Sequence, residues 1–495
     1  MKKYLLGIDI GTSSCKVAVF EASGKLCASA SEEYELFRPE RGFAEQSPED
    51  WWWATCKALN TIFDKSDVRA DEIAAVGVAA QSWACVAVDS EGNALCRAPI
   101  WMDTRAEGIC ADLRQSIDES EIFKICGNPL SPTYTTAKVL WMKQNLPSAY
   151  EKTCKILQAN SYIVLRLTGK MTQDISQGYG WHCFDVNKLG WDTDIARLLG
   201  IDTHLLPEVY PCDSVVGSVT EQASRLTGLV SGTPVVTGGL DAACATLGVG
   251  VIENGQTQEQ GGQAGGMSIC LDKPYSDMRL ILSPHVVPNR WLLQGGTVGG
   301  GGVMRWLDRE LGEHGLESGT NSFNRLNELA ASVAPGSDGL IFLPYMAGER
   351  TPIWDPDAKG VYYGLDYTKT RAHLIRAGME GVAYSLRHNL EIAETAGATV
   401  NCLVASGGSA NSSLWNQIKA DVTGKILTVT ASEAATTRGA AILAGVGVGM
   451  FDSYTQAIIQ DKTQPVVYYP DPAAKKVYGE SYLRYLELYP RLKGL

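Results

Sequence analysis

The sequence lacks the features that mark several common classes of protein. Its 495 residues include 43 Lys and Arg against 55 Asp and Glu, which gives a net charge of −12 at pH 7. A chain without excess positive charge is not expected to bind nucleic acid or an anionic membrane surface, because it has few cations to neutralise phosphates. Its apolar runs are strand-sized before a Gly or a polar residue interrupts them, so no membrane-spanning segment is expected.

Cysteine and histidine are present without the spacing that binds metals or supports redox chemistry. The thirteen cysteines are never closer than eleven positions and form no C-x-x-C pair, which argues against zinc ribbons and thioredoxin-type activity. An odd, scattered set indicates reduced, mostly buried thiols in a cytoplasmic protein. The six histidines form no H-E-x-x-H helix.

Asp9 interrupts the apolar segment at the N-terminus, so a secretory signal is not expected.

The first half of the chain predicts an α/β unit that opens with an antiparallel meander. Apolar, β-rich runs at residues 4–9, 17–20 and 26–34 are separated by turn residues, and Pro48 then opens a helix. Residues 73–80 and 85–88 predict further strands. Because 45% of all residues are hydrophobic, there is ample material for buried cores.

A similar pattern restarts near residue 255. Residues 256–261 and 267–271 predict a hairpin around glycines. Later strands are expected at the segments 291–294, 339–345 and 401–405, and helices from Val303 to Leu311 and from Ser413 to Thr423. Between the halves, a buried strand from Pro234 ends in a turn, and Asp241 opens a helix that ends near Gly248. The repetition indicates an internal duplication with a boundary at residue 248.

The segment DIGTSSCK, residues 9–16, is the first candidate for chemistry. A carboxylate ends a strand, Gly11 permits close backbone approach, and hydroxyls and Lys16 follow. Backbone N–H groups and hydroxyls in such a turn can hold phosphate oxygens, and Asp9 can reach Mg²⁺ through water. The spacing differs from that of a P-loop. The alternative is an ordinary hairpin with a polar turn.

The segment GIDIGTS, residues 7–13, resembles the N-terminal phosphate segment of the sugar kinase, actin and heat-shock-70 superfamily. PYMAGERTP at 344–352 and AKGVYYGL at 358–365 are similar to the signature of the FGGY carbohydrate kinases, nearest to xylulokinase-like members. The resemblance runs from residue 4 to about 450. It implies an α/β fold of two actin-like (ribonuclease H-like) domains, residues 1–248 and 249–495, with a cleft between them. The first would hold the sugar and the catalytic base, and the second would bind the nucleotide.

The resemblance also implies an activity. The family uses ATP and Mg²⁺ to phosphorylate a primary hydroxyl of a small sugar, and a ketopentose such as xylulose is the first expectation. Kinases for glycerol, gluconate or ribulose are alternatives, and so is a non-catalytic sensor of the same fold. The expected partners are the sugar and ATP, and homodimers are frequent in the family.

Asp241, in GGLDAA (238–243), is the candidate catalytic base. A carboxylate at a helix N-terminus is stabilised by the helix dipole, although plain helix capping is the commoner role of a lone Asp. The Asp of the matching family segment takes the proton from the sugar hydroxyl, and the resemblance assigns that role here.

Two further segments are assigned to substrate binding by resemblance. In WMDTR (101–105), Asp103 is expected near the sugar and Arg105 is expected to order the cleft; the alternative is a surface ion pair worth little. In AQSWA (80–84), Gln81 is followed by Ser82 and Trp83 where the family usually has Met-His or Gln-His. Polar groups placed against individual hydroxyls separate one sugar from another, so this chain's specificity is expected to differ. Core packing is the alternative role for Trp83.

Nucleotide binding is expected at glycine-rich turns in both halves. Thr297 and the glycines at 299–302 precede a helix, whose N-terminus suits phosphates. SGGSANS at 406–412 resembles the family's adenine turn, and the second phosphate turn, usually G-T-S-G, is here GQAG at 262–265. The residues assigned to ATP are Gly11, Thr12, Ser13, Lys16, Gly262, Gln263, Thr297, Gly301, Gly407, Gly408 and Asn411.

Two conspicuous features are expected to be structural. Successive residues of a helix point about 100° apart, so Trp51, Trp52 and Trp53 cannot form one stacking face, and core and domain-edge packing is expected. Lys138 matches a Lys that is frequent in the family, and we interpret it as structural.

Overall fold

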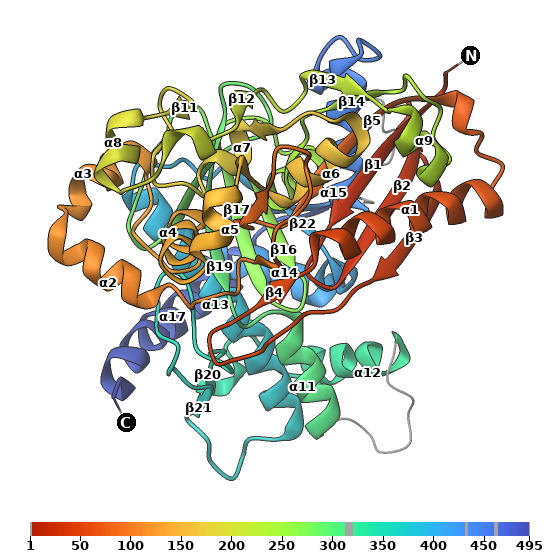
Figure 1. The fold of residues 1–495 in the computed structure, drawn as a ribbon. Helices are drawn as coiled ribbons and strands as arrows, with labels where there is room; N and C mark the ends of the chain where they lie inside the picture. The colour runs from red at the N-terminus through yellow and green to blue at the C-terminus, as the bar shows by residue number, and fades with distance from the viewer. Residues whose placement is uncertain (1, 312–319, 431–433, 460–463, 495) are drawn as a thin grey trace.

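The first sheet is built on the meander that the sequence predicts (Figure 1). The computed structural model describes residues 2–311, 320–430, 434–459 and 464–494. The central strand runs antiparallel to the strand that follows it and parallel to the strand of residues 73–80. In order across the sheet, the strands are β13 (Val215–Ser218), β14 (Pro234–Val236), β5 (Ile73–Ala80), β1 (Tyr4–Ile10), β2 (Ser14–Glu21) and β3 (Leu26–Glu33), with β15 (Gly239–Leu240) beside the end of β5.

The second sheet repeats this arrangement. Its central strand, β16, is antiparallel to β17 and parallel to β22, as β1 is to β2 and β5. In order, the strands are β18 (Ile281–Pro284), β19 (Trp291–Thr297), β17 (Gly265–Leu271), β16 (Gln256–Gly261), β22 (Cys402–Ser406), β23 (Ile426–Val429) and β24 (Val466–Tyr468). The same order and the same directions in both sheets confirm the internal duplication.

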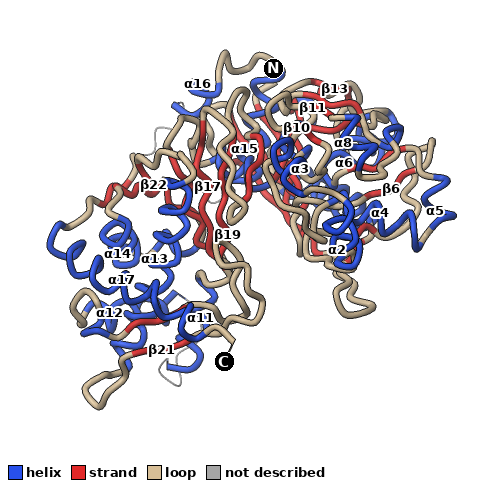
Figure 2. Tube along the Cα trace, turned by 90° about the vertical axis from the view of Figure 1, so that its left-hand side faces the viewer, coloured by secondary structure: helices blue, strands red, loops and turns tan. Residues whose placement is uncertain are grey.

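Helices cover both sheets and form the outer parts of the two halves. Figure 2 shows α11–α14 and α17 on one side of the strands and α2–α6 and α8 on the other. The helices of the first half are α1 (Pro48–Lys65), α2 (Glu107–Ser116), α3 (Glu119–Cys126), α4 (Thr135–Asn145), α5 (Pro147–Lys152), α6 (Ala159–Thr168), α7 (Ile175–Gly178), α8 (Thr193–Leu198), α9 (Glu221–Thr227) and α10 (Asp241–Gly248). Those of the second half are α11 (Gly301–Leu311), α12 (Thr320–Ala331), α13 (Arg371–Thr395), α14 (Ser413–Thr423), α15 (Ala435–Gly447), α16 (Tyr454–Ile459) and α17 (Pro472–Leu492).

Two predicted strands lie outside the main sheets. The segment 339–345 contains a strand that pairs with residues 361–363. Residues 86–88 pair with residues 155–157, and Val88 also forms a single bridge to Ala94. The two-stranded sheets in the described part of the chain are β4 (Glu45–Gln46) with β7 (Ala98–Pro99), β6 (Val86–Val88) with β8 (Lys155–Leu157), β9 (Thr172–Asp174) with β12 (Glu208–Tyr210), β10 (Phe184–Asp185) with β11 (Gly190–Trp191), and β20 (Ile341–Leu343) with β21 (Val361–Tyr363).

Helix α15 belongs to the second half of the chain but packs on the first sheet. It lies against β1, β5 and α10, and glycines bring the backbones together at each contact. A Cβ at Gly439 would stand 1.8 Å from the carbonyl oxygen of Cys244 in α10, and one at Gly7 would stand 1.9 Å from that of Thr437. No side chain fits at such a distance. The domain boundary at residue 248 stays a prediction. Helix α15 follows this boundary in the sequence but packs against elements that precede it.

The tryptophan triple is divided between the core and the surface. Trp51 and Trp52 are 0% and 1% exposed, whereas Trp53 is 54% exposed. The prediction that the three rings form no common platform is confirmed, but packing is the wrong interpretation for Trp53. Its position on α1 points it away from the sheet.

Two expectations from composition can be compared with the described residues. None of the helices in the described ranges is long and apolar enough to cross a membrane. All thirteen cysteines are unpaired and none is fully exposed, which confirms the expected free thiols.

The seam between α10 and α15 generates a stability prediction. Gly439→Ala should lower the free energy of unfolding by about 1–3 kcal/mol, because the methyl group has to push the two helix backbones apart. Gly479→Ala in α17 is the matched control, since no atom lies within 4 Å of its added Cβ. Urea denaturation compares the two. An Ala at 439 that stabilises the protein, as helix propensity alone would predict, would contradict the packing argument.

Candidate active site

Residues from both halves of the chain line a cavity of about 310 Å³ around Asp241. We call it the Asp241 cavity. The first half of the chain contributes Thr12, Gln81, Ser82, Trp83, Trp101, Tyr179 and Asp241, and the second contributes Gln260, Gly265, Gly266, Met267, Ser268, Ile281, Gln294, Gly295, Gly296 and Arg350. The structure therefore brings together the predicted base and three of the predicted substrate residues.

Asp241 is the first residue of α10. Its Oδ1 accepts a 2.6 Å hydrogen bond from the backbone N–H of Ala242, which leaves Oδ2 for another partner. Burial, and to a smaller extent the negative charge of Asp9, raise the pKa of Asp241 to about 7. A carboxylate with a pKa near neutrality is well suited to accept a proton from a hydroxyl group.

A buried polar network fixes the turn before Asp241. Asp174 accepts a 2.6 Å hydrogen bond from the hydroxyl of Ser176, which itself accepts the N–H of Leu240 at 2.9 Å. The side-chain amide of Asn160 donates to the other oxygen of Asp174 at 2.9 Å. Sequence reasoning missed these residues, because they form no spaced motif and meet only in the fold.

Trp83 forms one wall of the Asp241 cavity and also packs in the interior. It has a positive φ of 57°, which is rare for a large side chain. Its ring stacks on Tyr134 at 4.2 Å between centroids and lies edge-on to Tyr179 at 5.7 Å, and the hydroxyl of Tyr179 donates to Ser82. Core packing of Trp83 is therefore confirmed, and its contact with a substrate in the cavity stays a prediction.

Lys138, on α4, holds the unusual backbone at Trp83. It is fully buried, and its Nζ donates to the carbonyl oxygens of Trp83 at 2.8 Å and Ile100 at 2.7 Å. Burial lowers the pKa of Lys138 to about 7, against the opposing effect of Asp103. The structural interpretation of Lys138 is confirmed, and the two carbonyls that it joins belong to segments leading into the cavity wall.

Asp103 and Arg105 form a buried pair that does not line the Asp241 cavity. Arg105 donates to both oxygens of Asp103, and it also pairs with Glu45 at 2.7 Å. Their side chains are 0% and 2% exposed, so the alternative of a surface ion pair is wrong. The guanidinium lies between the rings of Phe43 and Trp141. The pair thus orders the loop beside Trp101, whereas contact of Asp103 with a sugar stays a prediction.

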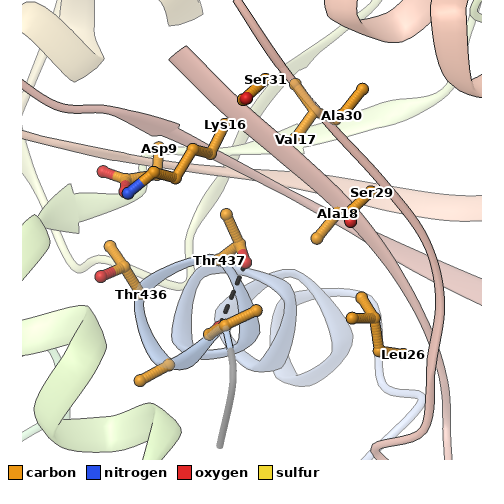
Figure 3. A pocket seen from close by; sticks show the side chains of 12 residues that line it. Asp9, Lys16, Val17, Ala18, Leu26, Ser29, Ala30, Ser31, Thr436 and Thr437 are labelled. Carbon is orange, nitrogen blue, oxygen red and sulfur yellow. Dashed lines mark hydrogen bonds between the residues drawn. The ribbon is translucent and has the colours of Figure 1, made fainter. Parts of the chain in front are cut away.

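Asp9 lies near the end of β1 and lines a second cavity. This cavity has a volume of about 450 Å³ and lies between the first sheet and the start of α15. Figure 3 shows Lys16 pointing toward Asp9, with Thr436 and Thr437 below them. Asp9 is 7% exposed, and its Oδ1 has no hydrogen-bond partner. Burial raises its pKa to about 6, and Lys16 opposes the shift.

The environment of Asp9 fits a hydrated magnesium ion. An unpartnered carboxylate oxygen is a ligand that Mg²⁺ prefers, and this ion is often held by one carboxylate together with waters and substrate phosphates. No cluster of three or more metal-binding side chains occurs in the described part of the chain. The role of Asp9 stays a prediction.

Of the other residues in the β1–β2 turn, Thr12 reaches the Asp241 cavity. Its hydroxyl accepts from Trp101 Nε1 at 2.9 Å and donates to Gln81 Oε1 at 3.5 Å. Lys16 lines the cavity beside Asp9, whereas Gly11 and Ser13 do not line either one. The turn forms as expected, and its contact with phosphate stays a prediction.

The second half contains a cavity of about 450 Å³ that we call the nucleotide cavity. Of the predicted ATP residues, Gly262, Gln263, Gly301, Gly408 and Asn411 line it, and Gly407, within the turn 406–412, has a positive φ of 82°. The residues that sequence reasoning missed come from α11–α14: Met304, Arg305, Phe323, Asn324, Asn327, Met379 and Trp415. Amphipathic α12 and α13 could have been predicted, but not their approach to the turn.

The N-terminus of α11 is occupied by the protein itself, which corrects one expectation. The N–H groups of Gly301 and Gly302 donate to the carbonyl oxygens of Gly262 and Gln263 at 2.8 and 2.9 Å. These two groups are therefore not free for phosphate. Thr297 is 4% exposed, donates to the carbonyl of Gly299 and does not line the nucleotide cavity, so the structure does not support it as a ligand.

The turn 262–265 lies between the two cavities. Its start, Gly262 and Gln263, lines the nucleotide cavity, and its end, Gly265, lines the Asp241 cavity. Both Gly262 and Gln263 are exposed. A phosphoryl group carried between the cavities would pass this turn, where an amide side chain replaces the usual hydroxyls.

The buried amine of Lys138 predicts a pH-dependent stability. Between pH 7 and 10.5 the unfolded chain holds a proton that the folded chain has lost, so the free energy of unfolding should rise with pH by up to about 1.4 kcal/mol per unit. Lys138→Met removes this contribution. Urea denaturation from pH 7 to 9.5 measures both proteins, and the free energy of unfolding of the wild type minus that of the variant should increase with pH. Exposed Lys170→Met is the control, and a constant difference for Lys138→Met would contradict the lowered pKa.

Variants of Gln263 test whether the turn 262–265 contributes to ATP binding. Losing one hydrogen bond to a charged group costs about 1.5–3 kcal/mol, so Gln263→Ala should raise the KM for ATP by about 10- to 150-fold if its amide replaces the hydroxyls. The double variant Gln263→Thr with Ala264→Ser should lower that KM if the longer side chain compensates poorly. Gln115→Ala on α2 is an exposed control. If neither change alters ATP affinity or kcat, the turn does not contact phosphate.

The comparisons with known proteins cover almost the entire chain. The model of the FGGY family of carbohydrate kinases matches with its N-terminal domain at residues 4–248 and with its C-terminal domain at residues 271–448. The chain is 29% identical over 495 residues to the xylulose kinase of Bacillus subtilis, covering 100% of this chain and 98% of that protein.

Solved structures agree in fold. The xylulose kinase from Rhodospirillum rubrum has a TM-score of 0.90 at 29% identity, with 99% of each chain covered. The gluconate kinase from Lactobacillus acidophilus has a TM-score of 0.91 at 26% identity, covering 99% of this chain and 98% of that one. The expected fold of two actin-like domains is confirmed.

Proposed function

The chain belongs to the FGGY family of carbohydrate kinases and is therefore a phosphotransferase, and we propose that it transfers a phosphoryl group from ATP to a primary hydroxyl of a small sugar. The observation that carries this proposal is the turn 262–265, which borders the nucleotide cavity at one end and the Asp241 cavity at the other. Donor and acceptor bound in the two cavities would face one another across it.

Asp241 is the base in this proposal. Its Oδ1 is held by the N–H of Ala242, so we assign Oδ2 to accept the proton of the attacking hydroxyl. Asp9 would hold Mg²⁺ through water, and the ion when bound neutralises charge on the nucleotide phosphates. Phosphoryl transfer depends mainly on positioning and charge stabilisation, so the remaining residues act by orienting the substrates and excluding water.

A ketopentose such as xylulose is our first candidate for the acceptor. The naming of the Bacillus subtilis and Rhodospirillum rubrum relatives supports it. Gluconate is the second candidate, supported by the Lactobacillus acidophilus relative and by a cationic side chain, Arg350, in the Asp241 cavity. The wall formed by Trp83 favours a short acceptor or one whose C–H face stacks on an indole ring.

The acceptor is identified by measuring ADP release in a coupled assay over a panel of ketopentoses, aldonates and polyols. One acceptor should exceed the others in kcat/KM. No turnover with any of them would favour the sensor alternative.

The thirteen unpaired thiols support a reducing compartment, and we propose the cytoplasm as the site of the reaction.

Asp241→Asn tests the chemistry. The amide keeps the size of the side chain but cannot accept the hydroxyl proton, so kcat should fall by about 10²- to 10⁴-fold. ATP affinity should be nearly unchanged, since Asp241 does not line the nucleotide cavity. Asp64→Asn on the exposed part of α1 is the control. Turnover equal to wild type in Asp241→Asn would remove this residue from the mechanism.

A further inference from the structure

Arg350 contributes a guanidinium group to the Asp241 cavity that the roles assigned so far leave unused. It belongs to the segment GERTP, residues 348–352, which carried the family resemblance but received no function there. The segment follows β20 and crosses the end of β19, so Arg350 enters the cavity from the second half of the chain, whereas Asp241 enters it from the first.

The backbone on both sides of Arg350 is fixed to β19. Before it, Glu349 Oε1 accepts the N–H groups of Val298 at 2.7 Å and of Arg350 itself at 2.8 Å. After it, the hydroxyl of Thr351 accepts the N–H of Gly296 at 2.7 Å and donates to its carbonyl oxygen at 3.1 Å. The side chain therefore starts from a rigid base.

Gly296 provides the space for the guanidinium. A Cβ at this position would stand 2.9 Å from Nη2 and 3.0 Å from Cζ of Arg350, closer than a methyl group tolerates. The planar group lies against the bare Cα of a residue that also lines the cavity. A residue with a side chain here would displace the guanidinium, so its placement depends on this glycine.

Among the described residues, Arg350 donates its backbone N–H to Glu349, whereas its guanidinium has no hydrogen bond or ion pair. Burial lowers its pKa, and the charge of Glu349 only partly opposes this. Arginine nevertheless stays charged, so this half-buried guanidinium is available to an anionic ligand in the cavity. The neighbouring Gln260, Gln294 and Ser268 are neutral and suit hydroxyl groups.

We propose that Arg350 binds an oxyanion of the ligand in the Asp241 cavity, either a carboxylate of the acceptor or the phosphoryl group that the acceptor receives. The five N–H donors of a guanidinium form a fork that matches both groups. The inference rests on the proposed function, since it takes the Asp241 cavity as the acceptor site. Arg350 does not line the nucleotide cavity, so it is not assigned to the bound nucleotide.

Calorimetric binding of three ligands distinguishes the two sources. The probes are gluconate, which carries a carboxylate; xylulose 5-phosphate, which carries a phosphate; and the neutral sugar that binds best in the panel. Arg350→Met should weaken one or both oxyanion ligands by about 10- to 150-fold and change the affinity for the neutral sugar by less than about threefold. Arg350→Lys should retain part of the affinity, since it keeps the charge but loses the fork.

Gly296→Ala provides a second variant that leaves the arginine in place. Its methyl group should push the guanidinium aside and weaken the same oxyanion ligand. Gly190→Ala, with no atom within 4 Å of the added Cβ, and Arg197→Met, on exposed α8, are the matched controls. Thermal melting verifies that each variant is folded.

The inference is overturned if Arg350→Met and Gly296→Ala leave both oxyanion ligands bound as in wild type, or if they weaken the neutral sugar equally. A loss confined to gluconate assigns the oxyanion to the acceptor, and a loss confined to xylulose 5-phosphate assigns it to the transferred group. Calorimetry requires no turnover. Failure of the proposed function, seen as no ADP release with any acceptor, is therefore a separate result.

Discussion

The close contact of α10 and α15 with β1 and β5 is the constraint on which the site depends. Glycines at this seam, among them Gly7 and Gly439, allow backbone to touch backbone without intervening side chains. Asp9 ends β1, and Asp241 begins α10, so both acids are placed by elements of the seam. Their proximity is reflected in the pKa of Asp241, which the charge of Asp9 raises. A seam that moved by the width of a methyl group would change the spacing of the acids, and with it their proton affinities.

Charge is distributed unevenly around the two cavities. The first half supplies the acids at the seam, and the second supplies Arg350 and the amide-bearing turn 262–265. If Asp241 and Arg350 act as proposed, a proton would leave on the side of the first half and negative charge would be stabilised on the side of the second. Lys138 and the Arg105–Asp103 pair stiffen the wall of the first half without lining the cavity.

Much of this arrangement could be predicted from the sequence, because hydrophobic runs and glycine turns are local signals. The meander, the duplication, the helix that begins at Asp241 and the turn at 407–411 all follow from them. Contacts between distant segments could not be predicted in the same way. Nothing in the local pattern of residues 301 and 302 indicates that their N–H groups bond to residues 262 and 263, and nothing in residues 160–176 indicates a polar network behind Asp241. Arg350 was visible as part of a motif, but its position in the cavity depends on Gly296, 54 residues earlier.

The placement of α15 also has a consequence for how the protein is made. A ribosome releases the strands of the first sheet long before it has synthesised the helix that covers one face of β1 and β5. About 200 residues separate the end of α10 from the end of α15, and at roughly 5–20 residues per second their synthesis takes on the order of 10–40 s. During that interval the apolar face of a nearly complete half remains open to other chains. The first half therefore completes its packing only when the second half is finished, and the two halves mature together rather than in turn.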